Sequence, residues 1–186
     1  MITVVDYDPN WPARFESLRQ EYAHAMATAG VPLVAIEHVG STSVPGLAAR
    51  PVIDCDIVVP PADVEVAAAV LVGLGFRPLG ELGIPQRWAF KEPTRLLGTN
   101  TYVIVEGSLS MRNHLALRDT LRSDAALRDE YAAVKKRMGA TAANIDDYGR
   151  GKSAAVQRIL AAVGISQEER ASIAANPVPS HADAPR

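Results

Sequence analysis

The chain has 186 residues, 48% of them hydrophobic, a single cysteine and a formal net charge of −2. This length predicts one domain, over residues 1–165, and the small negative charge argues against nucleic acid as a partner, since no basic field would hold a polyanion. Because Cys55 cannot form an internal disulfide, no apolar run approaches the roughly 20 residues of a membrane span and no signal peptide is evident, we expect a cytoplasmic protein.

The first forty residues predict a helix and a strand that lead into a serine-rich loop. Apolar residues recur three and four apart from Phe15 to Ala29, which predicts an amphipathic helix that ends at Gly30. Residues 33–39 form a short apolar run rich in β-branched side chains and predict a strand. This strand runs into Gly40-Ser41-Thr42-Ser43, and Val44-Pro45-Gly46 then predicts a tight turn.

A central strand and a run of helices follow. Residues 52–59 are almost continuously apolar and predict a buried strand that carries Asp54 and Asp56. The remaining predicted elements are a helix over residues 63–75, a weak strand at 87–90, a strand at 99–105 and helices from Ser110 to Val163.

The order of these elements, with strands first and helices last, predicts an α+β fold. Beyond Gly164 the sequence becomes rich in Ser, Ala and Pro. Such a segment buries too little apolar surface to offset the entropy lost on ordering, so we expect residues 166–186 to be a disordered tail.

Two features of this pattern indicate chemistry. A strand that ends in Gly40-Ser41 presents free backbone N–H groups to phosphate, and Thr42-Ser43 extends this candidate nucleotide-binding loop. Asp54 and Asp56 lie two apart on a strand, so both carboxylates project from one face and repel each other. A divalent cation is the simplest remedy, because Mg²⁺ (or Mn²⁺) binds through one or two carboxylates plus substrate phosphates. The pattern therefore predicts a nucleotidyl-transfer site in which both aspartates are catalytic and metal-binding.

Each of these residues also has a purely structural alternative. In the structural alternative, Gly40 is present simply to allow the turn, and the side chains of Ser41-Thr42-Ser43 simply cap a helix. Asp54 can form an ion pair with Arg50 or a lysine, and Asp56 can mark the solvent end of its strand. The joint occurrence of the loop and the aspartate pair favours the functional interpretation.

The ungapped stretch from Glu37 to Asp54, EHVGSTSVPGLAARPVID, strongly resembles the GrpB family. Tyr7-Asp8-Pro9-Asn10-Trp11 is similar to the opening segment of family members, and Arg118-Asp119-Thr120-Leu121-Arg122 and Tyr148-Gly149-Arg150-Gly151-Lys152-Ser153 are similar to two motifs near their end. The resemblance covers residues 3–163 and implies the polymerase-β-like nucleotidyltransferase fold, a small mixed sheet flanked by helices.

The resemblance also implies roles for further acidic and polar residues. Many relatives keep only the first acid of the strand pair, so Asp56 beside Asp54 favours catalysis. Tyr102 stands where relatives usually carry a histidine. Active nucleotidyltransferases use a third carboxylate on a neighbouring strand, and Glu106 is the candidate metal ligand there, its alternative being a solvated residue at the strand end.

Three basic residues are candidate nucleotide contacts under the same resemblance. Arg50 stands where relatives have lysine and can pair with a phosphate or with Asp54. Arg118 and Lys152 fall on the predicted helical half and can reach triphosphate oxygens, the alternative for each being a solvated helix face.

Two functional hypotheses follow. The first is a Mg²⁺- or Mn²⁺-dependent nucleotidyltransferase that moves a nucleoside monophosphate from a nucleoside triphosphate to a small acceptor. The second is a degenerate domain that binds a nucleotide or a partner protein without turnover, as Tyr102 and the weak third-acid candidate suggest.

Overall fold

The computed structural model describes residues 2–175, which form two compact units. The sheet unit comprises Pro9–Val39 and Val52–Arg112. The helical unit comprises the described parts of Met1–Asp8, Gly40–Pro51 and Asn113–Arg186. The sequence predicts one continuous domain. In the structure the chain passes from one unit to the other after residues 8, 39, 51 and 112, so neither unit is a continuous stretch of sequence.

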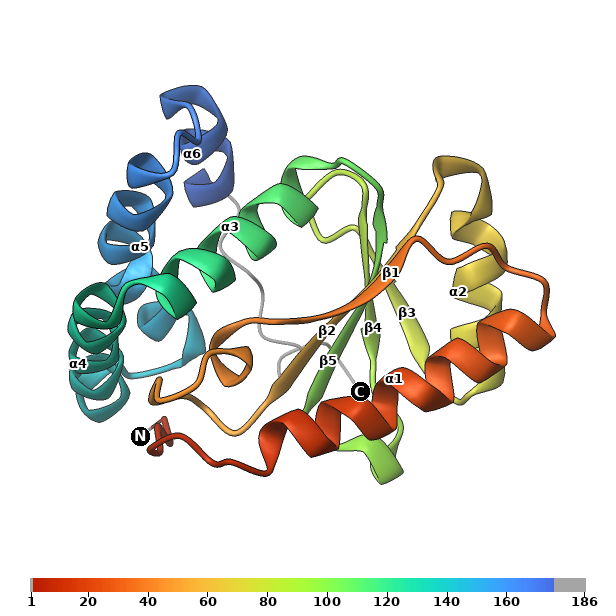
Figure 1. The fold of residues 1–186 in the computed structure, drawn as a ribbon, viewed down its shortest axis with the longest axis horizontal. Coiled ribbons are helices and arrows are strands. Elements are labelled where there is room, and N and C mark those ends of the chain that lie inside the picture. The colour runs from red at the N-terminus through yellow and green to blue at the C-terminus, as the bar shows by residue number, and fades with distance from the viewer. Residues whose placement is uncertain (1, 176–186) are drawn as a thin grey trace. The chain divides into compact units, whose positions relative to one another are not determined.

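The sheet unit is built on a five-stranded mixed sheet with the strand order β1-β2-β5-β4-β3 (Figure 1). The strands are β1 (Ala35–Val39), β2 (Ile53–Val59), β3 (Arg77–Gly80), β4 (Arg87–Lys91) and β5 (Thr99–Val105). β2 and β5 are parallel, and the other neighbours are antiparallel. The helices of this unit are α1 (Trp11–Thr28) and α2 (Val64–Gly73), with the short 3-10 turns η2 (Pro61–Asp63) and η3 (Thr94–Leu96).

Helix α1 covers one face of the sheet and so defines the direction of the side chains on the central strands. The Tyr22 hydroxyl lies 3.0 Å from Thr101 Oγ1, and the Phe15 ring stacks on His38 with the ring centroids 4.6 Å apart. His38, Cys55 and Thr101 are register partners across β1, β2 and β5. Because register partners point to the same face, this row points toward α1 and the residues on either side of it point away.

The helical unit contains α4 (Ala125–Thr141), α5 (Ile145–Ala162), α6 (Gln167–Ala175) and the 3-10 turn η1 (Ser41–Ser43). Helix α3 (Leu109–Ser123) begins in the sheet unit and continues into the helical unit. The buried core of the helical unit consists of Val44, Leu47, Leu121, Tyr131, Ala155 and Ile159. Among residues 2–175, none of the helices has the length and apolar character needed to cross a membrane.

The N-terminal residues of the helical unit are held by distant parts of the chain. Val5 and Ala49 form an isolated antiparallel bridge, with N–H to O=C distances of 2.8 and 2.9 Å. The Ile2 N–H donates to the Gly139 carbonyl of α4 at 3.1 Å. A Cβ atom at position 139 would lie 2.8 Å from Val4 Cγ2 and 2.9 Å from the Ile2 carbonyl oxygen, so this close approach requires glycine.

Helix α6 lies in the segment that the composition predicts to be disordered. Ser166 and Glu169 form a capping box, in which the Ser166 N–H donates to Glu169 Oε2 and the Glu169 N–H donates to Ser166 Oγ, both at 3.1 Å. This cap, together with packing against α5, orders a segment that is too polar to order itself. Residues 176–186 of the predicted tail lie outside the described residues.

Candidate active site

Strand β2 carries Asp54 and Asp56 on the sheet face that points away from α1. They flank Cys55, whose row points toward the helix, so the period of two places both carboxylates on the opposite face. Asp56 is buried, with 1% of its surface exposed, and Asp54 is half-buried. Val39, the last residue of β1, is the register partner of Asp54, and the next residue in the chain is Gly40.

The neighbouring strand β5 places two neutral side chains beside the aspartates. Asn100 is the register partner of Asp54, and its Nδ2 donates to Asp54 Oδ1 at 2.7 Å. Tyr102 is the register partner of Asp56. An amide and a phenol therefore occupy the β5 positions next to the aspartate pair, where an active nucleotidyltransferase is expected to have a third carboxylate.

Two glutamates differ in their relation to this face. Glu106 follows the end of β5, four residues beyond Tyr102, and so lies about 13 Å along the strand from the level of Asp56. The structure does not bring Glu106 to the aspartates, because the strand carries it past them. Glu37 on β1 is instead the register partner of Asp56 and shares its face. Glu37 was not predicted from the sequence, because its place depends on the β1–β2 register.

A buried arginine lies on the same face and was not predicted either. Arg87 on β4 is the register partner of Ile104, which lies two residues from Tyr102 on β5. The Arg87 Cζ atom lies 4.8 Å from the centroid of the Tyr102 ring, and 1% of the residue is exposed. Burial lowers the pKa of Arg87, while electrostatic interaction with Tyr102, Asp56 and Asp54 acts in the opposite direction. Arginine nevertheless remains charged in proteins, so this face carries a fixed positive charge.

Cys55 does not contribute a nucleophile to the site. The thiol is free and fully buried on the α1 side of β2. Burial raises the pKa of Cys55 well above its usual value, and the negative charges of Asp56, Asp54 and Glu37 raise it further. Because only the thiolate is an effective nucleophile, the candidate chemistry of this strand belongs to the aspartates.

The serine loop belongs to the helical unit and is stabilised by its own hydrogen bonds and by an arginine. Gly40 has φ 67° and ψ −172°, a conformation open essentially to glycine. Ser43 Oγ donates to the Gly40 carbonyl at 2.6 Å, and Arg122 Nε and Nη2 donate to the Ser43 carbonyl at 3.0 and 2.8 Å. Thr42 and Ser43 are buried and Ser41 is half-buried, so Ser41 has the most accessible hydroxyl of the loop.

Arg122 is a further residue whose role was not predicted from the sequence, although it lies in one of the quoted motifs. Its Nε and Nη2 atoms both donate to a single backbone oxygen of the serine loop. The sequence signal was the motif itself, but nothing in the motif indicates which carbonyl the guanidinium reaches.

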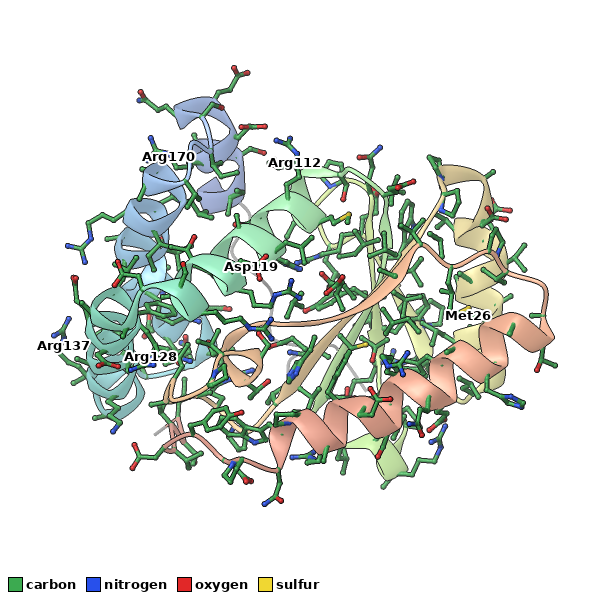
Figure 2. The ribbon with its side chains drawn as sticks, viewed as in Figure 1. Met26, Arg112, Asp119, Arg128, Arg137 and Arg170 are labelled. Atoms are coloured by element: carbon green, nitrogen blue, oxygen red, sulfur yellow. The ribbon has the colours of Figure 1, made fainter. Side chains whose placement is uncertain are left out.

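Two of the three predicted phosphate-binding cations lie near one buried tyrosine of the helical unit. The Lys152 Nζ atom lies 4.5 Å from the centroid of the Tyr148 ring. Burial raises the pKa of Tyr148 to about 12, and the positive charge of Arg50 acts to lower it. Arg118 instead pairs with Asp119, which Figure 2 shows on α3, with Arg118 Nε 2.7 Å from Asp119 Oδ1.

The aspartate face suits a metal ion that brings other ligands with it. Within residues 2–175 no group of three or more His, Cys, Asp or Glu side chains is placed to hold a metal ion. Asp54 and Asp56 offer hard carboxylate oxygens, and Mg²⁺ commonly uses one or two carboxylates and completes its shell with water and substrate phosphates. The donor set therefore fits Mg²⁺ or Mn²⁺ bound together with a nucleotide.

The fold is that of the polymerase-β-like nucleotidyltransferases. A crystal structure of the Cid1 poly(U) polymerase with MgGTP bound matches the chain with a TM-score of 0.52 at 15% identity. The match covers 70% of this chain and 43% of the Cid1 chain. At this identity the likeness concerns the fold alone, and it confirms the fold class expected from the sequence.

The chain belongs to the GrpB family. The model of this family, described as GrpB protein, matches residues 1–162. The crystal structure of the conserved protein GrpB from Enterococcus faecalis matches with a TM-score of 0.74 and 26% identity, over 87% of this chain and 99% of that chain. A UPF0157 protein of Halalkalibacterium halodurans is 34% identical over 162 residues, which are 86% of this chain and 80% of the relative. The family expected from the stretch Glu37 to Asp54 is thus confirmed.

Proposed function

We propose that this chain is a divalent-metal-dependent nucleotidyltransferase that moves a nucleoside monophosphate from a nucleoside triphosphate to a small acceptor. The observation that carries the proposal is the placement of Asp54 and Asp56 on one face of β2, opposite the face covered by α1. The fold supports it, because its structural neighbour Cid1 is a polymerase crystallised with MgGTP.

In this proposal Asp54 and Asp56 hold Mg²⁺ or Mn²⁺, which when bound neutralises charge on the phosphates and so favours in-line displacement. Asn100 orients Asp54 through the bond to Oδ1. The Ser41 hydroxyl and the Gly40 backbone bind triphosphate oxygens. One aspartate accepts the proton of the incoming acceptor group, since a carboxylate in hydrogen-bond reach of a hydroxyl is a suitable general base.

Among the basic residues, Arg50 and Lys152 are the phosphate contacts that the proposal retains. Arg118 is the weaker candidate, because its guanidinium is engaged by Asp119. Glu106 has no metal role in the proposal, since β5 carries it about 13 Å beyond the aspartates.

The test is the Asp54→Asn protein, in which the side chain keeps its size but loses its charge. We expect pyrophosphate release from nucleoside triphosphates, measured with a panel of small acceptors and Mg²⁺, to fall by at least about 100-fold because the metal loses a ligand. The matched control is Asp63→Asn, whose side chain makes no cap hydrogen bond at the start of α2 and should leave the rate unchanged. Wild-type release by Asp54→Asn would contradict the mechanism.

A second candidate is a nucleotide-binding domain without turnover, and the neutral Asn100 at the β5 position beside Asp54 favours it. Calorimetry with nucleoside triphosphates, with and without Mg²⁺, separates the two candidates. Metal-dependent binding without pyrophosphate release favours the binder, and absence of binding under all conditions excludes both. Each candidate assumes a cytoplasmic protein that meets nucleoside triphosphates.

A further inference from the structure

Tyr148 on α5 carries a hydroxyl group that the transfer mechanism does not use. Only 3% of the residue is exposed, and its hydroxyl makes no hydrogen bond within residues 2–175. Buried polar groups in proteins are nearly always hydrogen-bonded, because a hydroxyl withdrawn from water without a partner costs free energy. The Tyr148 hydroxyl therefore calls for a partner from outside the chain, a water molecule or a ligand.

Helix α5 places a lysine on the same side as this tyrosine. Tyr148 and Lys152 are four residues apart in the helix and so lie on a single face of it. Ala155 and Ile159, which continue that face, belong to the buried core of the helical unit. Lys152 is half-buried, and its Nζ atom lies 4.5 Å from the centroid of the Tyr148 ring. Lys152 therefore does not lie on the solvated face of α5.

The segment that follows the serine loop packs on this same face of α5. Val44 and Leu47 are fully buried in the core cluster that contains the two apolar residues of the face. Arg50, three residues beyond Leu47, is half-buried, and its positive charge acts to lower the pKa of Tyr148. One cation from α5 and one from the segment after the serine loop thus act on the same buried phenol.

A buried phenol with two cations close to it suits an oxyanion. The hydroxyl can donate one hydrogen bond, and lysine and arginine donate charge-assisted hydrogen bonds to phosphate oxygens. The stem of Lys152 is flexible, so its ammonium group can swing from the ring face toward an entering anion. Tyr148, Lys152 and Arg50 all belong to the helical unit, as does the serine loop. The cluster is therefore complete without any residue of the sheet unit.

We propose that Tyr148, Lys152 and Arg50 form a phosphate site in which the Tyr148 hydroxyl donates to a terminal phosphate of the triphosphate, and that this site binds polyphosphate without a metal ion. The inference rests on the proposed function, which supplies the triphosphate, and it adds Tyr148 to the two cations retained there. Burial raises the pKa of Tyr148 to about 12, so at neutral pH the group keeps its proton and can donate it. The helical unit would thus hold the phosphates that leave as pyrophosphate.

The experiment measures binding of sodium tripolyphosphate by isothermal titration calorimetry in the presence of EDTA. We expect wild-type protein to bind one tripolyphosphate per chain. Tyr148→Phe removes only the hydroxyl and should weaken this binding by about tenfold, because a hydrogen bond to a charged group is lost. Lys152→Met should weaken it by at least about tenfold, whereas Lys152→Arg keeps the charge and should stay close to wild type.

The matched control is Arg158→Met, which removes a positive charge from an exposed position of the same helix and should leave the affinity within about twofold of wild type. Thermal unfolding at neutral pH gives a second readout. Tripolyphosphate should raise the unfolding temperature of wild type by more than that of Tyr148→Phe, because a ligand stabilises in proportion to its occupancy. A merely structural tyrosine would give the same rise in both proteins.

Wild-type affinity of Tyr148→Phe for tripolyphosphate overturns the inference, because the hydroxyl then serves only a water molecule. Equal losses in Lys152→Met and Arg158→Met also overturn it, since charge alone would then attract the anion.

The transfer reaction is tested separately from this site. Asp54→Asn should bind tripolyphosphate like wild type while it loses pyrophosphate release. Wild-type protein that releases pyrophosphate but binds no tripolyphosphate in EDTA overturns the inference alone. Tripolyphosphate binding that Tyr148→Phe weakens, without pyrophosphate release from any nucleoside triphosphate, supports the site and overturns the proposed transfer.

Discussion

Arg122 supports the serine loop through two hydrogen bonds to one backbone oxygen. Its Nε and Nη2 atoms lie 3.0 and 2.8 Å from the Ser43 carbonyl oxygen, and the Ser43 hydroxyl in turn bonds the Gly40 carbonyl at 2.6 Å. Hydrogen bonds from a charged donor are stronger than hydrogen bonds between neutral groups. A buried carbonyl that loses its donor has given up its hydrogen bonds to water without replacement, which costs free energy. The arginine thus helps to fix the backbone that presents Ser41.

Replacing Arg122 with Gln should therefore loosen this loop. We expect a loss of about 1–2 kcal/mol in the free energy of unfolding, measured by urea titration, and faster amide exchange at Ser43 and Val44. The control is Arg128→Gln, because the Arg128 Nη1 atom lies 3.5 Å from the carbonyl oxygen of Pro45, in the turn that follows the loop, and should contribute less than about 0.5 kcal/mol. Equal losses in the two variants would argue against a specific role for Arg122.

At the scale of elements, helix α4 packs against the N-terminal residues so closely that position 139 has no room for a side chain. The Gly139→Ala methyl group would lie 2.9 Å from the Ile2 carbonyl oxygen and 2.8 Å from Val4 Cγ2. Since a backbone atom cannot move aside as a flexible side chain can, we expect destabilisation of about 1–3 kcal/mol in chemical denaturation.

The matched control for this substitution lies in helix α5. A Cβ at Gly149 would meet nothing within 4 Å, so Gly149→Ala should be neutral or stabilising by up to about 1 kcal/mol, as alanine is the better helix former. If both alanine variants were equally stable, the close approach of the N-terminal residues to α4 would be excluded.

The sequence predicts a feature of the site when that feature is determined by residues close together in the chain. The shared face of Asp54 and Asp56 follows from the period of two, and the positive φ of Gly40 follows from its place between a strand and a turn. Glu37 and Arg87 join the aspartate face only through the pairing of β1 and β4 with their neighbours, and a single sequence does not specify strand register.

Two further elements have weak signals in the sequence: the strand predicted at 87–90 is confirmed as β4, whereas α6 lies in the segment predicted to be disordered. The segment around Arg87 is interrupted by glycine and proline, so its strand signal is weak although the residue is fully buried. The capping box of Ser166 and Glu169 begins α6 within a segment whose overall composition favours disorder. Both elements gain their order from packing that the composition does not reveal.

At the scale of the whole molecule, stability in alkaline solution should reflect Tyr148. Burial raises its pKa to about 12, whereas a tyrosine in the unfolded chain ionises near pH 10. Below pH 10 both states keep the proton, and this residue adds no pH dependence. Between pH 10 and 12 the unfolded chain loses the proton first, so stability falls, by up to about 3 kcal/mol.

Thermal unfolding of wild type and Tyr148→Phe between pH 7 and 12 measures this contribution. At pH 7 the variant should lose little, because the Tyr148 hydroxyl makes no hydrogen bond within residues 2–175. Above pH 10 the variant should lose less stability than wild type. Tyr22, whose pKa burial also raises, is present in both proteins and so cancels in the comparison. Identical pH profiles would contradict the assignment.

The pairing of Ile2 with Gly139 has a consequence for how the protein is made. During synthesis the N-terminal residues leave the ribosome long before α4 does, so this contact is closed late. Val5 meets Ala49 much earlier, and their bridge can hold the N-terminal segment near its final place while the rest of the chain is translated. The contact of Ile2 with α4 is thus among the last of this unit to form.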